Sequence, residues 1–80
     1  MDRTGDTIQF SIVRSIGVLG ESRGGWKTEL NLVSWNGKEP KCDVRAWDPS
    51  HQRMGKGITF TQGEAERLHI LLGEYLGGAT

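Results

Sequence analysis

The chain has 80 residues, equal numbers of basic and acidic side chains (ten of each) and a hydrophobic fraction of only 35%. Its length predicts one domain spanning residues 1–80, and a core this thin is often completed by a second subunit. The single cysteine, Cys42, excludes an intrachain disulfide. No apolar run approaches the roughly 20 residues of a membrane span, and residues 1–6 lack the apolar core of a signal peptide. We therefore expect a soluble cytoplasmic protein, with association with the nucleoid as one setting.

The charges are unevenly distributed along the chain. Residues 23–56 carry seven basic side chains against four acidic ones, whereas residues 62–80 carry three glutamates against one arginine. A basic middle segment allows a basic face on a neutral protein, as a nucleic-acid partner would require.

The first predicted element is a long strand beginning at Thr7. Ile8, Phe10 and Ile12 alternate with polar residues, and the pattern breaks before an apolar run resumes at Ile16, which indicates a β-bulge near residues 14–15. Residues 20–25 form a glycine-rich loop by composition. The loop lacks the Gly-Lys-Ser/Thr sequence of a phosphate-binding loop, so we reject that interpretation.

Two further strands, residues 26–35 and 41–47, are joined by Asn36-Gly37, the dipeptide most typical of a tight hairpin turn. In the first of these strands, Leu30 and Leu32 share one face, which we expect to face the core. The opposite face is mostly polar and includes one tryptophan. Residues 48–51 predict a turn, in which Asp48 bonds the backbone beyond Pro49.

The last two predicted elements are a short strand and a helix. Residues 54–60 read as a strand, and Thr61-Gln-Gly-Glu64 is a capping box that starts a helix. Apolar residues then recur at helical spacing up to Leu76, before Gly77-Gly78. The fold class is therefore α+β: a four-stranded antiparallel sheet followed by one helix (ββββα). A five-stranded barrel of the oligonucleotide-binding type is the alternative, with a strand in place of the helix.

A basic and aromatic sheet face is the candidate functional site. Alternation places Lys27, Trp35, Lys41, Arg45 and Trp47 on one face. Lys56 lies at the adjoining edge, although strict alternation would put it inward with Ile58. Aromatic rings stack on unpaired bases and cations contact phosphates, so such a face suits single-stranded nucleic acid. The competing interpretation is that the tryptophans are core or interface residues and the lysines a solvated face. A further alternative is a protein-interaction module that docks another chain through the sheet face or the helix.

No set of residues predicts catalysis, a metal site or a cofactor. Cys42 lies in the apolar phase of its strand, and neither His51 nor His69 forms a zinc-ligand spacing with it. Asp43, which lies between Lys41 and Arg45, is typical of a salt-bridge partner. We therefore expect a protein that is not an enzyme, with no cofactor and no small-molecule substrate.

Three segments, residues 25–35, 39–47 and 54–61, resemble the YdbC-like bacterial branch of the transcriptional positive cofactor 4 family. The most specific parts are Asp43-Val-Arg-Ala-Trp47 and Gly55-Lys-Gly-Ile-Thr59, with a capped helix directly after them. The resemblance implies a ββββα protomer and a homodimer joined largely through the helix. It also implies curved sheets that hold single-stranded DNA with little sequence preference, in transcription, replication or repair. RNA is the alternative partner that the residues themselves allow.

Carried over by position, the family's basic and aromatic sheet-face residues fall on the nucleic-acid-binding candidates Lys27, Trp35, Lys41, Arg45, Trp47 and Lys56. The sequence departs from the family at Cys42, where an aromatic residue is common. It also lacks the Ser/Lys-rich regulatory tail of the eukaryotic members, so the resemblance does not imply a coactivator regulated by phosphorylation.

Overall fold

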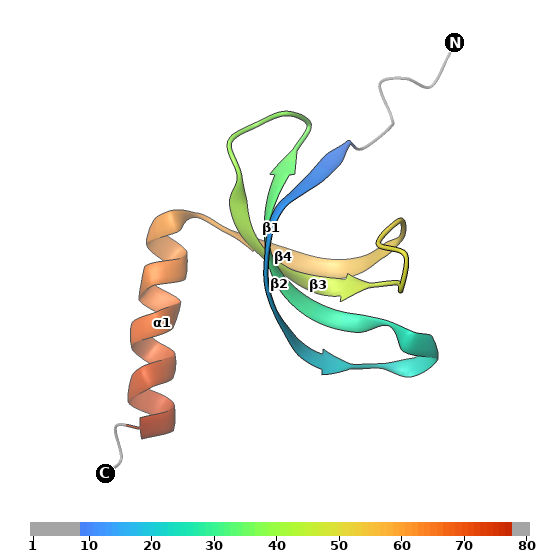
Figure 1. The fold of residues 1–80 in the computed structure, drawn as a ribbon. Coiled ribbons are helices and arrows are strands. Elements are labelled where there is room, and N and C mark those ends of the chain that lie inside the picture. Colours follow the sequence, from blue (N-terminus) through green and yellow to red (C-terminus); the bar gives the residue numbers. More distant parts are fainter. Residues whose placement is uncertain (1–8, 78–80) are drawn as a thin grey trace.

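The computed structural model describes residues 9–77 and confirms the predicted α+β architecture (Figure 1). One antiparallel sheet has the strand order β1-β2-β3-β4, and a single helix follows it. The elements are β1 (Phe10–Glu21), a 3₁₀ turn η2 (Arg23–Gly25), β2 (Lys27–Trp35), β3 (Lys41–Trp47), β4 (Met54–Phe60) and α1 (Gln62–Gly77). The barrel alternative is wrong, because the last element is a helix. The predicted start of the first strand at Thr7 lies outside the described residues.

The predicted Asn36-Gly37 turn is confirmed, and it also anchors the start of the chain's described part. Both residues have left-handed backbones (φ 52° and 76°), which asparagine and glycine tolerate best. The Lys38 N–H donates to the Trp35 carbonyl (2.9 Å) and closes the turn. The Asn36 N–H donates to the Gln9 carbonyl (2.7 Å), while the Gln9 N–H donates to the Asn36 side-chain oxygen (3.0 Å). Asn36 thus both forms the turn and holds it beside the residue that precedes β1.

The helix begins with the predicted capping box. The Glu64 N–H donates to the Thr61 hydroxyl (3.1 Å), and the Thr61 N–H donates to the Glu64 carboxylate (2.9 Å). Two N–H groups that a helix start leaves unpaired are satisfied in this way, so α1 begins at a defined point directly after β4.

Strand β1 has more bulges than the sequence predicts. Its pairing with β2 shifts register between Ile12 and Arg14, between Ser15 and Gly17, and between Val18 and Gly20. As a result, the 12 residues of β1 run beside the nine of β2. Each extra residue bends the strand and increases its twist. The bulges therefore allow the edge strand to follow a strongly curved sheet (Figure 1).

The sheet curls along its strands. Phe10 pairs with Trp35 at one end of β2, and Trp47 pairs with Lys27 at the other end. Nevertheless, the rings of Phe10 and Trp47 lie only 5.1 Å apart. That contact requires the two ends of the sheet to bend toward each other. The face that carries Phe10, Trp35 and Trp47 is therefore the inside of the curve, which we call the concave face.

This curvature reverses the expected pattern of burial. The leucine face was expected to form the core and the polar face to be exposed. Within this chain, Asn31 and Asp43 on the concave face are completely buried, whereas Leu30 and Leu32 on the opposite, outer face are only half-buried. The expectation is wrong for a physical reason: a curved sheet encloses its own concave side chains, and α1 does not close over the outer face.

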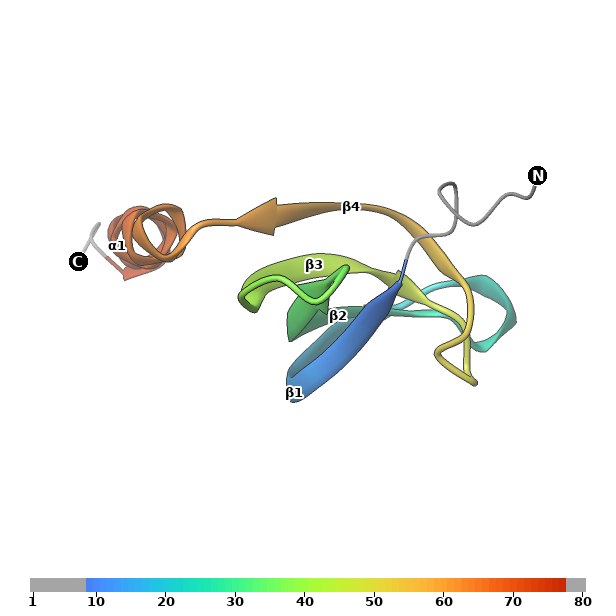
Figure 2. The same cartoon turned by 90° about the horizontal axis from the view of Figure 1, so that it is seen from above.

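Helix α1 lies to one side of the sheet, beyond the end of β4 (Figure 2). It packs against β3 and β4, and none of its described side chains is buried. Tyr75 and Leu76 are 80% and 74% exposed. No helix among residues 9–77 is both long and apolar enough to span a membrane.

Candidate functional site

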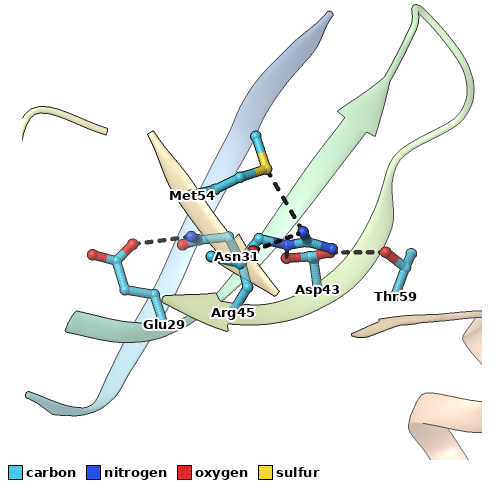
Figure 3. Close-up of polar contacts among 7 residues, drawn as sticks. Glu29, Asn31, Asp43, Arg45, Met54 and Thr59 are labelled. Atoms are coloured by element: carbon cyan, nitrogen blue, oxygen red, sulfur yellow. Dashed lines mark hydrogen bonds and ion pairs between the residues drawn. The ribbon is translucent and has the colours of Figure 1, made fainter. Parts of the chain in front are cut away.

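The centre of the concave face is an ion pair between Arg45 and Asp43 (Figure 3). The Arg45 Nε and Nη2 groups donate to the two oxygens of Asp43 at 2.7 and 2.8 Å, which is a bidentate arrangement. The Thr59 hydroxyl donates to the same carboxylate at 2.8 Å, so β4 also contributes. The predicted role of Asp43 as a salt-bridge partner is confirmed, and charge-assisted bonds of this kind are strong because their geometry is fixed.

Arg45 is held from several sides, and its side chain is only 15% exposed. Its guanidinium lies 4.8 Å from the centre of the Trp35 ring, in cation–π geometry. Its Nη1 group donates to the Gly55 carbonyl (3.3 Å) and to the Met54 sulfur (3.6 Å). Opposite Arg45, a side chain at Gly57 would overlap the arginine Cβ and the backbone of β3. The second glycine of the Gly-Lys-Gly motif is therefore required by close packing.

Trp47 lies inside the curve, where it is 1% exposed. Its ring contacts Phe10 (5.1 Å between centroids) on one strand and His51 (5.8 Å) on the turn after β3. The sequence correctly predicts the face, but the expected exposure of the ring is not observed. Its indole N–H is buried without a hydrogen-bond acceptor among the described residues. A base could stack on this ring only if Phe10 or His51 moved.

The other four candidates differ in exposure. Lys27 and Lys41, at opposite ends of the concave face, are exposed, as is Lys56, while Trp35 is half-buried. Lys56 lies at a β-bulge: Met54 pairs with Trp47 and Gly57 with Arg45, so two residues of β4, Gly55 and Lys56, lie opposite Ala46. The bulge explains why the phase of Lys56 could not be read from the sequence.

Sequence reasoning missed a second polar cluster on the concave face. Glu29 is buried, and its carboxylate accepts from the Asn31 side-chain amide (3.0 Å). The His51 Nε2 atom lies 2.9 and 3.0 Å from the two oxygens of that carboxylate. Since 22 residues separate Glu29 from His51, no local pattern predicts the contact. The only available signal was the glutamate's place in the same phase as Lys27 and Asn31.

The turn that carries His51 is stabilised by Asp48, as predicted. One Asp48 oxygen accepts from the N–H groups of Gln52 and Arg53 (2.9 and 2.8 Å), and the other accepts from the Ser50 hydroxyl (2.7 Å). These bonds, that of Ser50 first, lower the pKa of Asp48 from 3.8 to about 2. Within this rigid turn, His51 adopts a left-handed backbone (φ 61°) that directs its ring toward Trp47.

A pH titration checks the role of this turn. Because the pKa of Asp48 is lower in the folded chain, its stabilising contribution is complete above about pH 4 and is lost as the pH falls toward 2. We expect the wild type to melt at a higher temperature than Asp48→Asn at pH 6, with the gap narrowing between pH 4 and 2. A gap that stays constant with pH would mean that the ionised carboxylate does not stabilise the turn.

Within residues 9–77, no three His, Cys, Asp or Glu side chains are grouped as a metal ion would need. Cys42 lies on the outer face and is half-buried. The candidate site in the described residues is thus the concave face, which has polar and aromatic side chains at its centre and lysine side chains at its edges.

Comparison with known proteins adds two findings. Residues 22–70, from the loop after β1 into the middle of α1, match the model of the family described as Transcriptional Coactivator p15 (PC4). An uncharacterized protein from Treponema pallidum (strain Nichols) is 43% identical over 67 residues, which cover 84% of this chain and 79% of the relative.

Proposed function

Because the chain belongs to the Transcriptional Coactivator p15 (PC4) family, we propose that it binds single-stranded DNA with little sequence preference and acts as a homodimer. The PC4 family is a non-enzymatic family known for binding single-stranded DNA and for coactivation of transcription. We place this chain's action in the cytoplasm or at the nucleoid, in transcription, replication or repair.

The observation that carries the DNA-binding proposal is the arrangement of exposed lysines around the concave face. Lys27 and Lys41 extend from opposite ends of this face, and Lys56 from the neighbouring bulge. We propose that these three contact phosphates and that the half-buried Trp35 offers its ring to a base. Arg45 and Trp47 act from beneath by holding the face in shape. The side chains of Arg45 and Trp47 are already engaged in hydrogen bonds and in ring contacts, respectively, within the chain, which leaves little of their surface for DNA.

A salt titration with labelled oligo-dT tests this arrangement. Fluorescence anisotropy would give the association constant at several salt concentrations, and removal of one phosphate contact should lower the slope by about 0.7 for a single strand. We expect Lys27→Ala, Lys41→Ala and Lys56→Ala each to weaken binding and to reduce the slope by about that amount. Arg67→Ala, in α1, is the matched control and should leave the slope unchanged.

Two results would contradict the proposal. One is no binding of oligo-dT by the wild type at low salt, and the other is binding that does not respond to added salt. Strong, salt-independent binding to a protein without affinity for oligonucleotides would favour the interaction-module alternative. Competition with duplex DNA distinguishes single-stranded DNA binding from general DNA binding. Stacking on Trp35 requires unpaired bases, so the duplex should compete poorly.

The dimer proposal is supported by the apolar surface that this chain leaves uncovered. Leu71, Leu72, Tyr75 and Leu76 of α1 are all exposed. A hollow of about 270 Å³ also separates the helix from the outer face of the sheet, with Leu30 in its lining. Monomeric soluble proteins rarely expose a continuous apolar surface of this kind. A second copy of the chain would cover both surfaces.

Light scattering tests the dimer proposal. We expect the wild type to have twice the mass of the chain, and Leu76→Glu to shift the mass toward that of the monomer, because a buried unpaired charge is costly. Glu74→Gln, on the same helix, should remain dimeric. A wild type with the mass of one chain at micromolar concentration would refute the proposal.

A further inference from the structure

A pocket lies at one end of the concave face and shares Lys27 with the phosphate contacts proposed above. It has a volume of about 380 Å³, within the range of small-molecule sites. Lys27, Glu29, Trp47, Asp48 and His51 are in its lining. They come from β2, from the end of β3 and from the hydrogen-bonded turn after it.

The charges of the pocket favour a nucleobase over a phosphate. Two carboxylates, Glu29 and Asp48, lie in its lining against one lysine. Asp48 is occupied by the bonds of its own turn, whereas Glu29 accepts from the Asn31 amide and faces His51. An ionised carboxylate offers about four acceptor positions, so Glu29 retains the capacity to accept a further bond. A phosphate would be repelled here, while an amino group would be attracted.

Two other lining residues fit a planar ligand with an acceptor atom. The His51 side chain is 42% exposed, although one side of its ring lies near Trp47. A base would stack on the exposed part of this ring. The Trp47 indole N–H is buried and has no acceptor among the described residues, so an acceptor on the ligand would satisfy it only if the surrounding side chains move. Lys27, at the exposed end of the strand, is placed to meet the attached phosphate.

We propose that this pocket binds one nucleotide of the strand and selects a base that carries an exocyclic amino group. The proposal rests on the proposed function and adds a single selective position to a site that is otherwise tolerant of sequence. Cytosine, adenine and guanine offer an amino donor to Glu29. Thymine offers only one ring N–H, flanked by two carbonyls that the carboxylate repels.

Mononucleotide titrations followed by amide chemical shifts test the proposal, with dCMP and dTMP as probes. We expect dCMP to shift the amides of Lys27, Glu29 and His51 and to bind about fivefold more tightly than dTMP, the lower end for one selective base contact. Glu29→Gln keeps the shape and should bring the ratio to about one. Glu39→Gln removes an exposed acid outside the pocket and should preserve the ratio.

A second variant covers the case in which Glu29→Gln does not fold. Lys27→Met removes an exposed cation, and we expect it to lower the affinity for dCMP to that for deoxycytidine. Equal binding of dCMP and dTMP by the wild type, or shifts confined to other regions, would overturn the pocket proposal. Oligo-dT binding separates the two proposals: if oligo-dT binds while the mononucleotide ratio is one, only the pocket proposal fails.

Discussion

A Trp47→Ala variant is expected to show no cooperative unfolding transition on heating, because the substitution removes most of the stability that the fold has at ordinary temperatures. Truncating a buried aromatic side chain typically costs roughly 3–5 kcal/mol. A domain of this size has a total stability of roughly 4–12 kcal/mol. Trp47 is 1% exposed and contacts Phe10 and His51, so its removal would break the contact that joins the two ends of the curled sheet. Circular dichroism melts provide the measurement.

Trp47→Phe is the matched control, because it keeps an aromatic ring between the same neighbours. We expect this variant to retain a cooperative melt at a reduced temperature. A Trp47→Ala protein that melts within a few degrees of the wild type would show that the concave side chains are not its core. If such a folded variant also failed to bind oligo-dT, Trp47 would contact DNA directly, as its position in the strand pattern first indicated.

The elements of the fold were predictable because their signals are local. The Asn36-Gly37 turn requires two left-handed residues in succession, and the capping box of Thr61 and Glu64 is complete within four residues. Alternation within β3 correctly grouped Asp43, Arg45 and Trp47 on one face. Each of these features depends on residues that are close together in the sequence, so the sequence alone predicts it.

The enclosed face was not predictable, because it depends on how the strands bend over their whole length. Alternation indicates which residues share a face, but it does not indicate which face lies inside a curve. Leu30 and Leu32 suggested a core by composition, yet the curl buries Asn31 and Asp43 instead. Two further bulges in β1 and the contact between Glu29 and His51 likewise depend on the folded sheet.

The buried position of Asp43 leads to the second prediction of large effect. Asp43→Ala would leave the Arg45 guanidinium without its bidentate partner in a site where its side chain is only 15% exposed. Breaking a buried pair by removing one partner costs roughly 3–5 kcal/mol, mostly because a charge remains uncompensated. We expect a large fall in the free energy of unfolding, measured by urea denaturation.

A double-mutant cycle distinguishes this cause from a general loss of packing. If the uncompensated charge dominates, the double variant Asp43→Ala/Arg45→Met should be more stable than Asp43→Ala alone, because the unpaired cation is gone. If the loss in free energy of unfolding for the double variant equals the sum of the losses for Asp43→Ala and Arg45→Met, this interpretation is contradicted. The Thr59→Val variant measures the contribution of the hydrogen bond from β4, since it removes only the hydroxyl that donates to Asp43. It should lower the free energy of unfolding by about 1 kcal/mol. A loss as large as that of Asp43→Ala would instead mean that the stabilisation comes from the link to β4, so the ranking of the three variants identifies which contact holds the concave face together.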